Sequence, residues 1–134
     1  MSPASSAPSS HAQAPALSDC AIIPMADVLY SRWTTPILWV LQHHGPQRFT
    51  EIRRHLGTVT AKVLTQRLRH LERDGLIHHA VTGSVPPRSD YSITALGLSL
   101  NPAFRELAAW STTNLHLVEQ ARQDYDTSGN RRPA

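Results

Sequence analysis

Apolar residues recur along much of this chain at intervals of three and four, the spacing that gathers side chains on one face of an α-helix. Residues 17–30, whose apolar residues lie between positions 22 and 29, are compatible with a short helix that covers part of a core. The next apolar stretch predicts a helix that Ser31 or Thr35 would cap. Pro36 fits in its first turn, where a missing N–H costs least, and Gly45 ends it.

Two further helices are predicted with only a short turn between them. Thr50 is placed to cap a helix through Leu56, which Gly57 ends. Thr60 is placed to cap a helix to about Asp74, whose apolar stripe consists of Val63, Leu64, Leu68 and Leu71. Two helices joined by so short a turn predict a helix-turn-helix.

A β-hairpin is predicted directly after this pair. Residues 76–81 and 91–93 suit two antiparallel strands, and a loop rich in Gly and Pro separates them. Such a hairpin is a wing. Thr94 then caps a long helical stretch with a bend near Asn101 and Pro102. The predicted fold is mainly α with a small β-hairpin wing, an α+β winged helix-turn-helix.

The length of 134 residues suits one folded domain. Residues 1–16 are rich in Ser, Ala and Pro and predict a disordered arm, residues 17–125 the folded unit, and residues 126–134 a disordered tail. A single cysteine excludes an intrachain disulfide framework and favours a reducing cytoplasm, and no stretch is apolar enough to span a membrane. No glycine-rich phosphate loop or nucleophile elbow occurs, so the chain is predicted not to be an enzyme.

Positive charge gathers in the middle of the chain. Between Arg48 and Arg73 there are seven basic residues and two acidic ones, whereas the whole chain has a net charge of +3. A basic face on a nearly neutral body is the pattern expected of a protein that binds a polyanion. On charge alone, an ordinary solvated helix surface remains an equal alternative.

Several short motifs follow one another in an order that resembles one known family. They are Trp33-Thr34, 49–53, 62–68, 74–77, 85–88 with Tyr91, Leu96-Gly97 and Ala109-Trp110. Together, over about residues 20–111, they resemble the HxlR-type bacterial transcription regulators. The resemblance implies a homodimer with a winged helix-turn-helix in each subunit, and a dimer contact formed by the first and last helices.

The helix from Thr60 is predicted to enter the major groove of double-stranded DNA. If its leucines are buried, the opposite flank presents Ala61, Lys62, Thr65, Gln66 and Arg69. Residues in the first turns of such a helix reach base edges, where Gln pairs with adenine and Lys with guanine. Thr60 belongs to the same predicted contact set.

Other arginines are predicted to contact the DNA backbone or the minor groove. Arg53, Arg54, Arg69 and Arg73 suit phosphate contacts, and Arg88, in the tip of a Pro-stiffened loop, suits the minor groove. Arg67 is open to two interpretations, a DNA contact or an ion pair with an acid such as Glu51.

An apolar stripe on the last helical stretch predicts a partner helix, because it is longer than one small domain needs. The predicted dimer contacts are Ile22, Phe104, Leu107, Trp110, Leu115 and Val118. A two-fold homodimer predicts a palindromic operator, at which we expect repression. The alternative is that this stretch folds back on its own domain.

Signal sensing is left with several alternatives. Cys20 lies where the HxlR resemblance implies a cysteine before the first helix, which would make it an oxidant or electrophile sensor; otherwise it is a packing residue and a small molecule is the effector. The paired histidines His43-His44 and His78-His79 diverge on a helix or strand, so no metal site and no cofactor are predicted. A winged-helix module that binds protein or RNA is the remaining alternative class.

Overall fold

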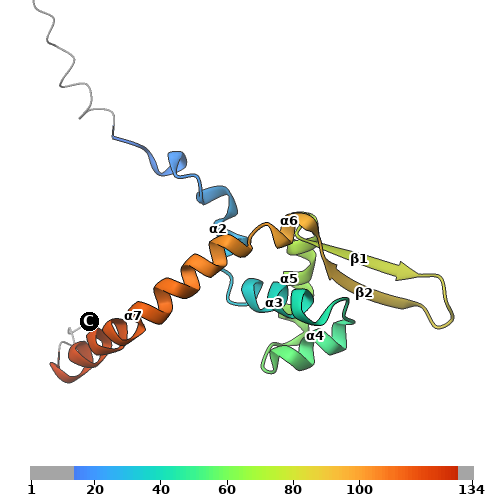
Figure 1. Ribbon diagram of the computed structural model, residues 1–134. Helices are drawn as coiled ribbons and strands as arrows, with labels where there is room; N and C mark the ends of the chain where they lie inside the picture. The colour runs from blue at the N-terminus through green and yellow to red at the C-terminus, as the bar shows by residue number, and fades with distance from the viewer. Residues whose placement is uncertain (1–13, 130–134) are drawn as a thin grey trace, which may run out of the picture.

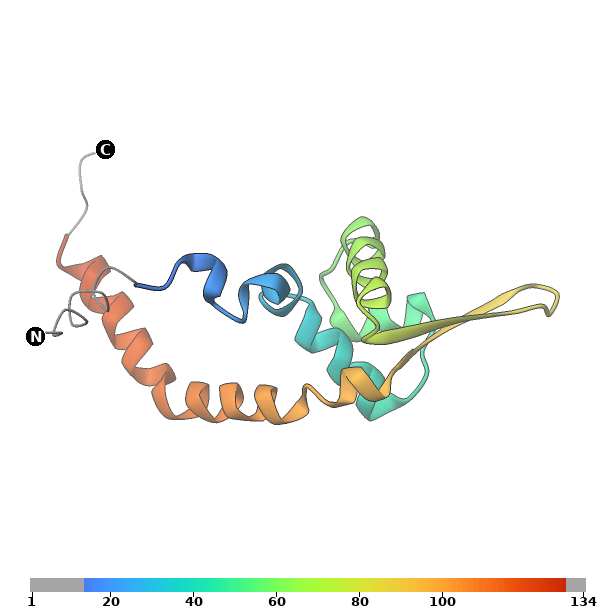
Figure 2. The ribbon, with the colours of Figure 1, turned by 90° about the horizontal axis from the view of Figure 1, so that it is seen from above.

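A computed structural model describes residues 14–129 of the chain. It shows a helical body from which three parts extend (Figure 1). The wing leaves one side, while the N-terminal segment and the long last helix leave the other, as a second view confirms (Figure 2). Most of the predicted arm, residues 1–13, and the last part of the predicted tail, residues 130–134, lie outside the described residues.

The short helix expected within residues 17–30 forms only over four residues. The segment forms two short 3-10 turns, η1 (Leu17–Asp19) and η2 (Ile23–Met25), and a four-residue helix, α2 (Ala26–Leu29). Pro24 lies in η2, and it has no N–H to give to a continuous α-helix. The spacing of apolar residues therefore does not give the secondary structure of this segment. Val28 is the only buried residue of α2.

Helix α3 (Thr34–His44) begins with a tertiary contact, so both predicted caps, Ser31 and Thr35, are wrong. The Trp33 residue at the N-cap provides no side-chain cap. Buried Thr34 instead donates its hydroxyl to the carbonyl of Val28 at 2.5 Å, which joins α3 to α2. Pro36 lies in the first turn as predicted, and Gly45 ends the helix at φ 75°.

Helices α4 (Phe49–Leu56) and α5 (Ala61–Arg73) form the predicted pair, and α4 starts earlier than expected. Thr50 lies inside α4, so its predicted capping role is wrong; the Glu51 carboxylate accepts the Arg48 N–H at 2.8 Å instead. Thr60 caps α5 as predicted by accepting the Val63 N–H at 3.2 Å. The turn between them follows Gly57, whose φ of 82° suits glycine.

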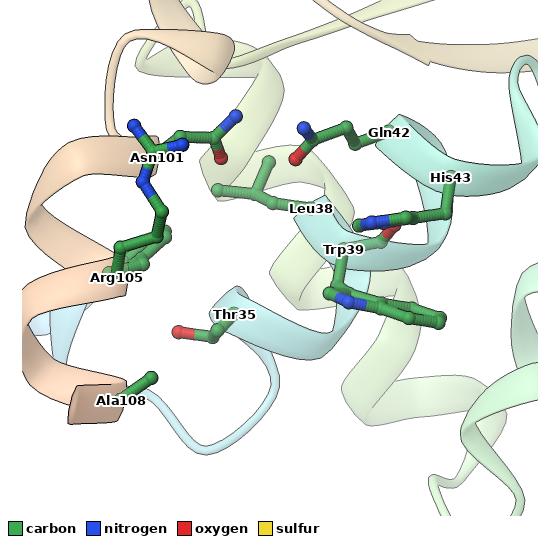
Figure 3. Close-up of a pocket in the computed structure, with 9 residues that line it drawn as sticks. Thr35, Leu38, Trp39, Gln42, His43, Asn101, Arg105 and Ala108 are labelled. Carbon is green, nitrogen blue, oxygen red and sulfur yellow. The ribbon is translucent and has the colours of Figure 1, made fainter. Parts of the chain in front are cut away.

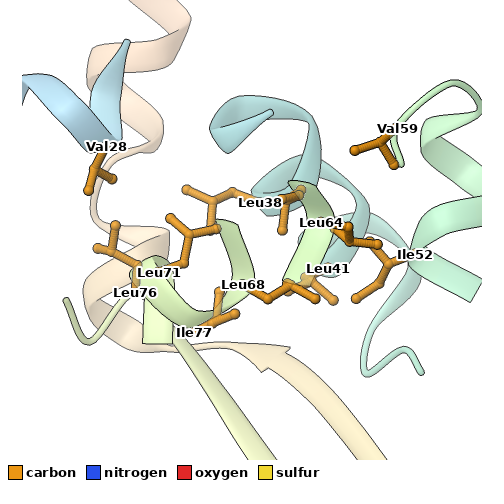
Figure 4. Close-up of a cluster of buried hydrophobic side chains, with 11 residues drawn as sticks. Val28, Leu38, Leu41, Ile52, Val59, Leu64, Leu68, Leu71, Leu76 and Ile77 are labelled. Carbon is orange, nitrogen blue, oxygen red and sulfur yellow. The ribbon is translucent and has the colours of Figure 1, made fainter. Parts of the chain in front are cut away.

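One apolar cluster holds these helices together (Figure 4). Leu64, Leu68 and Leu71 of α5 are no more than 1% exposed. They share the cluster with Ile37 and Leu41 of α3, Ile52 of α4 and the start of the wing at Leu76 and Ile77. The two helices of the pair are therefore locked to the third by side-chain burial.

The wing is an antiparallel pair, β1 (Ile77–Thr82) and β2 (Arg88–Ile93), in which Ile77 faces Ile93 and Thr82 faces Arg88. Both strands are predicted, but β2 is three residues longer than the pattern indicated. Gln47, just before α4, exchanges backbone hydrogen bonds with Tyr91 at 2.8 and 2.9 Å. This bridge fixes the base of the wing beside the helix-turn-helix.

The last helical stretch is interrupted at residues 99–100, next to the bend predicted near Asn101 and Pro102. Thr94 caps the short α6 (Ala95–Leu98), and α7 (Asn101–Thr127) carries Pro102 in its first turn. Phe104 packs on the core, but no residue of α7 is fully buried, and the helix leaves the body (Figure 1). Within the described residues α7 therefore does not fold back on its own domain. It also ends two residues beyond the predicted boundary at 125.

No helix in residues 14–129 has the length and apolar character that crossing a bilayer requires.

Gly97 is required where α6 crosses the start of the wing. A Cβ at this position would collide with the Leu76 carbonyl oxygen and approach Ile93 Cγ1 to 2.7 Å. We expect Gly97→Ala to lower the free energy of unfolding by about 1–3 kcal/mol, because backbone must move to make room. Denaturant unfolding at a fixed protein concentration measures this.

Gly83→Ala is the matched control, since nothing lies within 4 Å of the Cβ position there. It should leave stability within about 0.5 kcal/mol of the wild type. Equal effects of the two substitutions would contradict the close packing at Gly97.

Candidate nucleic-acid interface

The polar flank of α5 is an exposed surface of the helix-turn-helix. Burial of the three leucines fixes the rotation of α5 about its axis, and the predicted residues Ala61, Lys62, Gln66 and Arg69 are exposed. No hydrogen bond or ion pair with another described residue occupies the side chains of Lys62, Gln66 or Arg69. These three groups are therefore available to an external partner.

Two predicted contact residues, Thr60 and Thr65, use their hydroxyls inside the protein. Thr60 Oγ1 accepts the Val63 N–H, and the Thr65 hydroxyl donates to the Ala61 carbonyl at 2.8 Å. Neither residue is excluded from a contact surface. Their first role, however, is to start α5 and to satisfy its backbone, so Lys62 and Gln66 provide the unoccupied polar groups of its first two turns.

The two adjacent arginines of α4 differ in their surroundings. Arg53 Nε donates to the Val59 carbonyl at 3.2 Å, which holds the turn between α4 and α5. Arg54 is exposed, and no hydrogen bond or ion pair within residues 14–129 involves its guanidinium. Arg53 is thus partly a structural residue, whereas Arg54 is a free surface cation.

The suggested ion pair between Arg67 and Glu51 is wrong. The Glu51 carboxylate is used by the Arg48 N–H at the start of α4. Arg67 reaches the Asp27 carbonyl at 3.5 Å, which places it on the side of α5 that faces α2. It therefore belongs to the contact between α5 and the N-terminal segment.

Arg88 lies at the base of the wing loop, which corrects its predicted position at the tip. It is the first residue of β2 and faces Thr82, and its Nε lies 3.7 Å from the Asp90 carboxylate. A surface hollow of about 310 Å³ beside the loop is lined by both Arg48 and Arg88. In the sequence Arg48 contributes only to the charge of the basic segment, because its place before α4 does not indicate that it lies beside the wing.

Side chains also brace the wing against α5. His79 of β1 stacks on Tyr91 of β2 at 4.2 Å, hydrogen-bonds Ser89, and lies 3.8 Å from the Glu72 carboxylate of α5. Burial raises the pKa of Tyr91, Glu72 raises it further, and Arg69 acts in the opposite direction. Tyr91 thus stays neutral near pH 7 and acts as a packing residue that holds the wing beside the C-terminal half of α5.

The remaining predicted residues lie away from this surface. Beyond Phe104 the apolar side chains of α7 are largely exposed, at 61% for Leu107, 60% for Trp110 and 49% for Leu115. Ile22 is 45% exposed, and Val118 is half-buried. Leu117 is also exposed, at 58%, but it is not among the predicted dimer contacts because it lies beside the apolar stripe. Cys20 is a free, exposed thiol that follows η1.

Within residues 14–129, no three His, Cys, Asp or Glu side chains lie close enough together to hold a metal ion.

Comparison with known proteins identifies the class of this fold. Residues 28–119 match the HxlR-like helix-turn-helix family. The chain belongs to the HxlR-like family. YybR of Bacillus subtilis (strain 168), an uncharacterized HTH-type transcriptional regulator, is 34% identical over 105 residues, which cover 78% of this chain and 83% of YybR. The resemblance noted from the motifs is confirmed.

Solved structures support the same assignment. The crystal structure of the HTH-type transcriptional regulator YtcD matches with a TM-score of 0.67 and 34% identity, over 72% of this chain and 97% of YtcD. The redox regulator HypR in its reduced form matches with a TM-score of 0.66 and 32% identity, over 74% of this chain and 97% of HypR. The HxlR-like chain is an HTH-type transcriptional regulator with a winged helix-turn-helix fold, and the family is one of regulators, not of enzymes.

Arg54→Ala tests the prediction that Arg54 of α4 contacts DNA phosphates. We expect it to weaken binding to all duplexes alike and to reduce the slope of log affinity against log salt by about one unit, because one fewer counterion is released. Fluorescence anisotropy of a labelled duplex at several salt concentrations measures both.

Arg122→Ala, an exposed arginine on α7, is the control and should leave the slope unchanged. An unaltered slope in Arg54→Ala would remove this residue from the contact surface.

Proposed function

We propose that this HxlR-like regulator binds double-stranded DNA in a sequence-specific way, as a homodimer on a palindromic operator, and acts as a repressor. The polar flank of α5 carries the proposal. An α-helix fits the major groove of B-DNA, and residues in its first turns reach base edges. Lys62 and Gln66 occupy those turns with unused donors and acceptors.

The elements around α5 carry cations that suit contacts with the DNA phosphate backbone. Arg54 on α4, and Arg48 and Arg88 at the wing, supply cations on elements adjacent to α5. Phosphate contacts from such residues would set affinity and register, while the α5 flank would set sequence. Where the operator overlaps the site that a polymerase needs, a bound regulator excludes the polymerase, and repression is the expected sense of control.

The dimer is proposed from the apolar side chains of α7. Helix α7 has 27 residues, leaves the body, and exposes Leu107, Trp110 and Leu115. An apolar surface of this size is rarely left in contact with water in a monomer. A second copy, related by a two-fold axis, would cover it. Two α5 helices would then contact half-sites about 34 Å apart or a multiple of that.

Selection of bound duplexes from a random pool tests the proposed function. We expect an enriched inverted repeat with the spacing of one or more helical turns. Enrichment of no duplex sequence at moderate salt would contradict the proposal and would favour a winged-helix module for protein or RNA.

Gln66→Ala should cost about 1–3 kcal/mol of binding free energy at one base pair of each half-site and relax the preference there, since a bidentate contact to a base is lost. Anisotropy titrations on duplexes substituted at single positions measure this.

Gln123→Ala, an exposed glutamine on α7, should change neither affinity nor preference. Equal losses for Gln66→Ala on every duplex would assign Gln66 to the backbone and not to a base.

Redox control through Cys20 is a second proposal, which the likeness to HypR favours. HypR is a redox regulator with structures in reduced and oxidised forms. In this chain Cys20 is exposed and is the single cysteine. Peroxide would oxidise its thiolate to a sulfenic acid, which could form a disulfide with the second subunit or with a small thiol. The alternative is a small-molecule effector with Cys20 as a structural residue.

Cys20→Ser separates these alternatives. We expect hydrogen peroxide to change the duplex affinity of the wild type by about fivefold or more and to leave the variant unaffected, because the variant has no thiol to oxidise. Gel shifts with and without oxidant measure the difference; identical responses would leave the thiol no role in regulation.

A further inference from the structure

A pocket of about 370 Å³ lies between α3 and the first half of α7, a part of the molecule that the proposed DNA contacts do not use. Its volume falls in the range of small-molecule sites. Figure 3 shows side chains of α7 and α3 facing each other across it, with Asn101, Arg105 and Ala108 on one side and Thr35, Leu38 and Gln42 on the other.

The chemistry of this pocket suits an anion with an apolar body. Arg105 is the single permanent charge among the lining residues, and no carboxylate lines the pocket. Leu38, Phe104 and Ala108 contribute apolar surface. The polar side chains of Thr35, Gln42, Asn101 and Arg105 make no hydrogen bond with any other residue in the range 14–129, so the fold does not use them.

An aromatic pair forms one rim of the pocket. Trp39 and His43 stack with ring centroids 4.2 Å apart, and the His43 ring is held by a 2.9 Å hydrogen bond between Nδ1 and the Trp39 carbonyl. Trp39 is nevertheless 53% exposed. A planar ligand would cover indole surface that water now contacts, a favourable change for an aromatic face.

We infer that this pocket binds a small carboxylate with a planar, apolar body. The carboxylate would pair with the Arg105 guanidinium. A planar guanidinium is suited to this pair, because it can donate two parallel hydrogen bonds to the two carboxylate oxygens. Gln42, Asn101 and Thr35 supply further donors from both helices, and the ring of the ligand would lie against Trp39 and the apolar lining.

Such a ligand would be an effector, and this step rests on the proposed function. Helix α3 is fixed in the core through Ile37 and Leu41, whereas α7 touches the body mainly near its start and carries the proposed dimer surface. A ligand that bridges the two helices sets the angle at which α7 leaves. In a dimer that angle determines the separation of the two α5 helices.

Calorimetry of the full-length protein with benzoate tests the site without DNA. We expect a dissociation constant of about a millimolar, given the small ligand. Arg105→Met should weaken benzoate binding by about 10- to 100-fold, because a charge-assisted pair is lost, and Arg122→Met should not. Benzamide, of the same shape and without charge, should bind weakly and respond little to Arg105→Met.

Absence of benzoate binding overturns the proposal; this would occur if the second subunit filled the pocket. Benzoate affinity that is the same in the wild type and in Arg105→Met also overturns it. Saturating benzoate should change duplex affinity by about fivefold or more in the wild type and not in Arg105→Met. Benzoate that binds through Arg105 without changing duplex affinity overturns the effector role. If no duplex binds under any condition, the proposed function fails, and the carboxylate site is still decided by calorimetry.

Discussion

Burial of Leu64, Leu68 and Leu71 against α3 and α4 is the constraint on which the rest of the structure depends. Side chains three and four residues apart share one face of a helix, so burying these three fixes the rotation of α5 about its axis. The opposite flank, with Lys62 and Gln66, must then face outward. Loss of that packing would free α5 to turn, and the polar residues would no longer present a defined pattern.

The turn before α5 and the wing are held in place by contacts with α4, with α5 and within the wing itself. Arg53 holds the turn before α5 through the Val59 carbonyl, and the backbone bridge between Gln47 and Tyr91 ties the wing to the start of α4. His79 and Tyr91 brace the wing from within, close to Glu72 on α5. The exposed cations Arg48, Arg54 and Arg88 are thus carried by elements of one connected body.

Local chemistry made the centre of the chain predictable. The Thr60 cap, the three leucines of α5, Gly45 and Gly57 depend on residues near in sequence, and the structure has them as expected. Some errors are local, since Pro24 interrupts the N-terminal helix and Glu51 replaces Thr50 at the start of α4. Others arise where groups outside the helix decide its contacts. Thr34 bonds the Val28 carbonyl, which moves the start of α3, and Arg67 turns to Asp27 instead of Glu51. The pocket at Arg105 depends on how α7 crosses α3, and no spacing of residues within either helix indicates that.

Backbone amide NMR of the protein, titrated with its selected duplex, shows which surface of the helix-turn-helix contacts DNA. We expect the largest chemical-shift changes on the first two turns of α5, around Lys62 and Gln66, smaller ones on Arg54 and the wing loop, and none along the last turns of α7. Changes concentrated on α7, with α5 unaffected at saturating duplex, would contradict the proposed contact through α5.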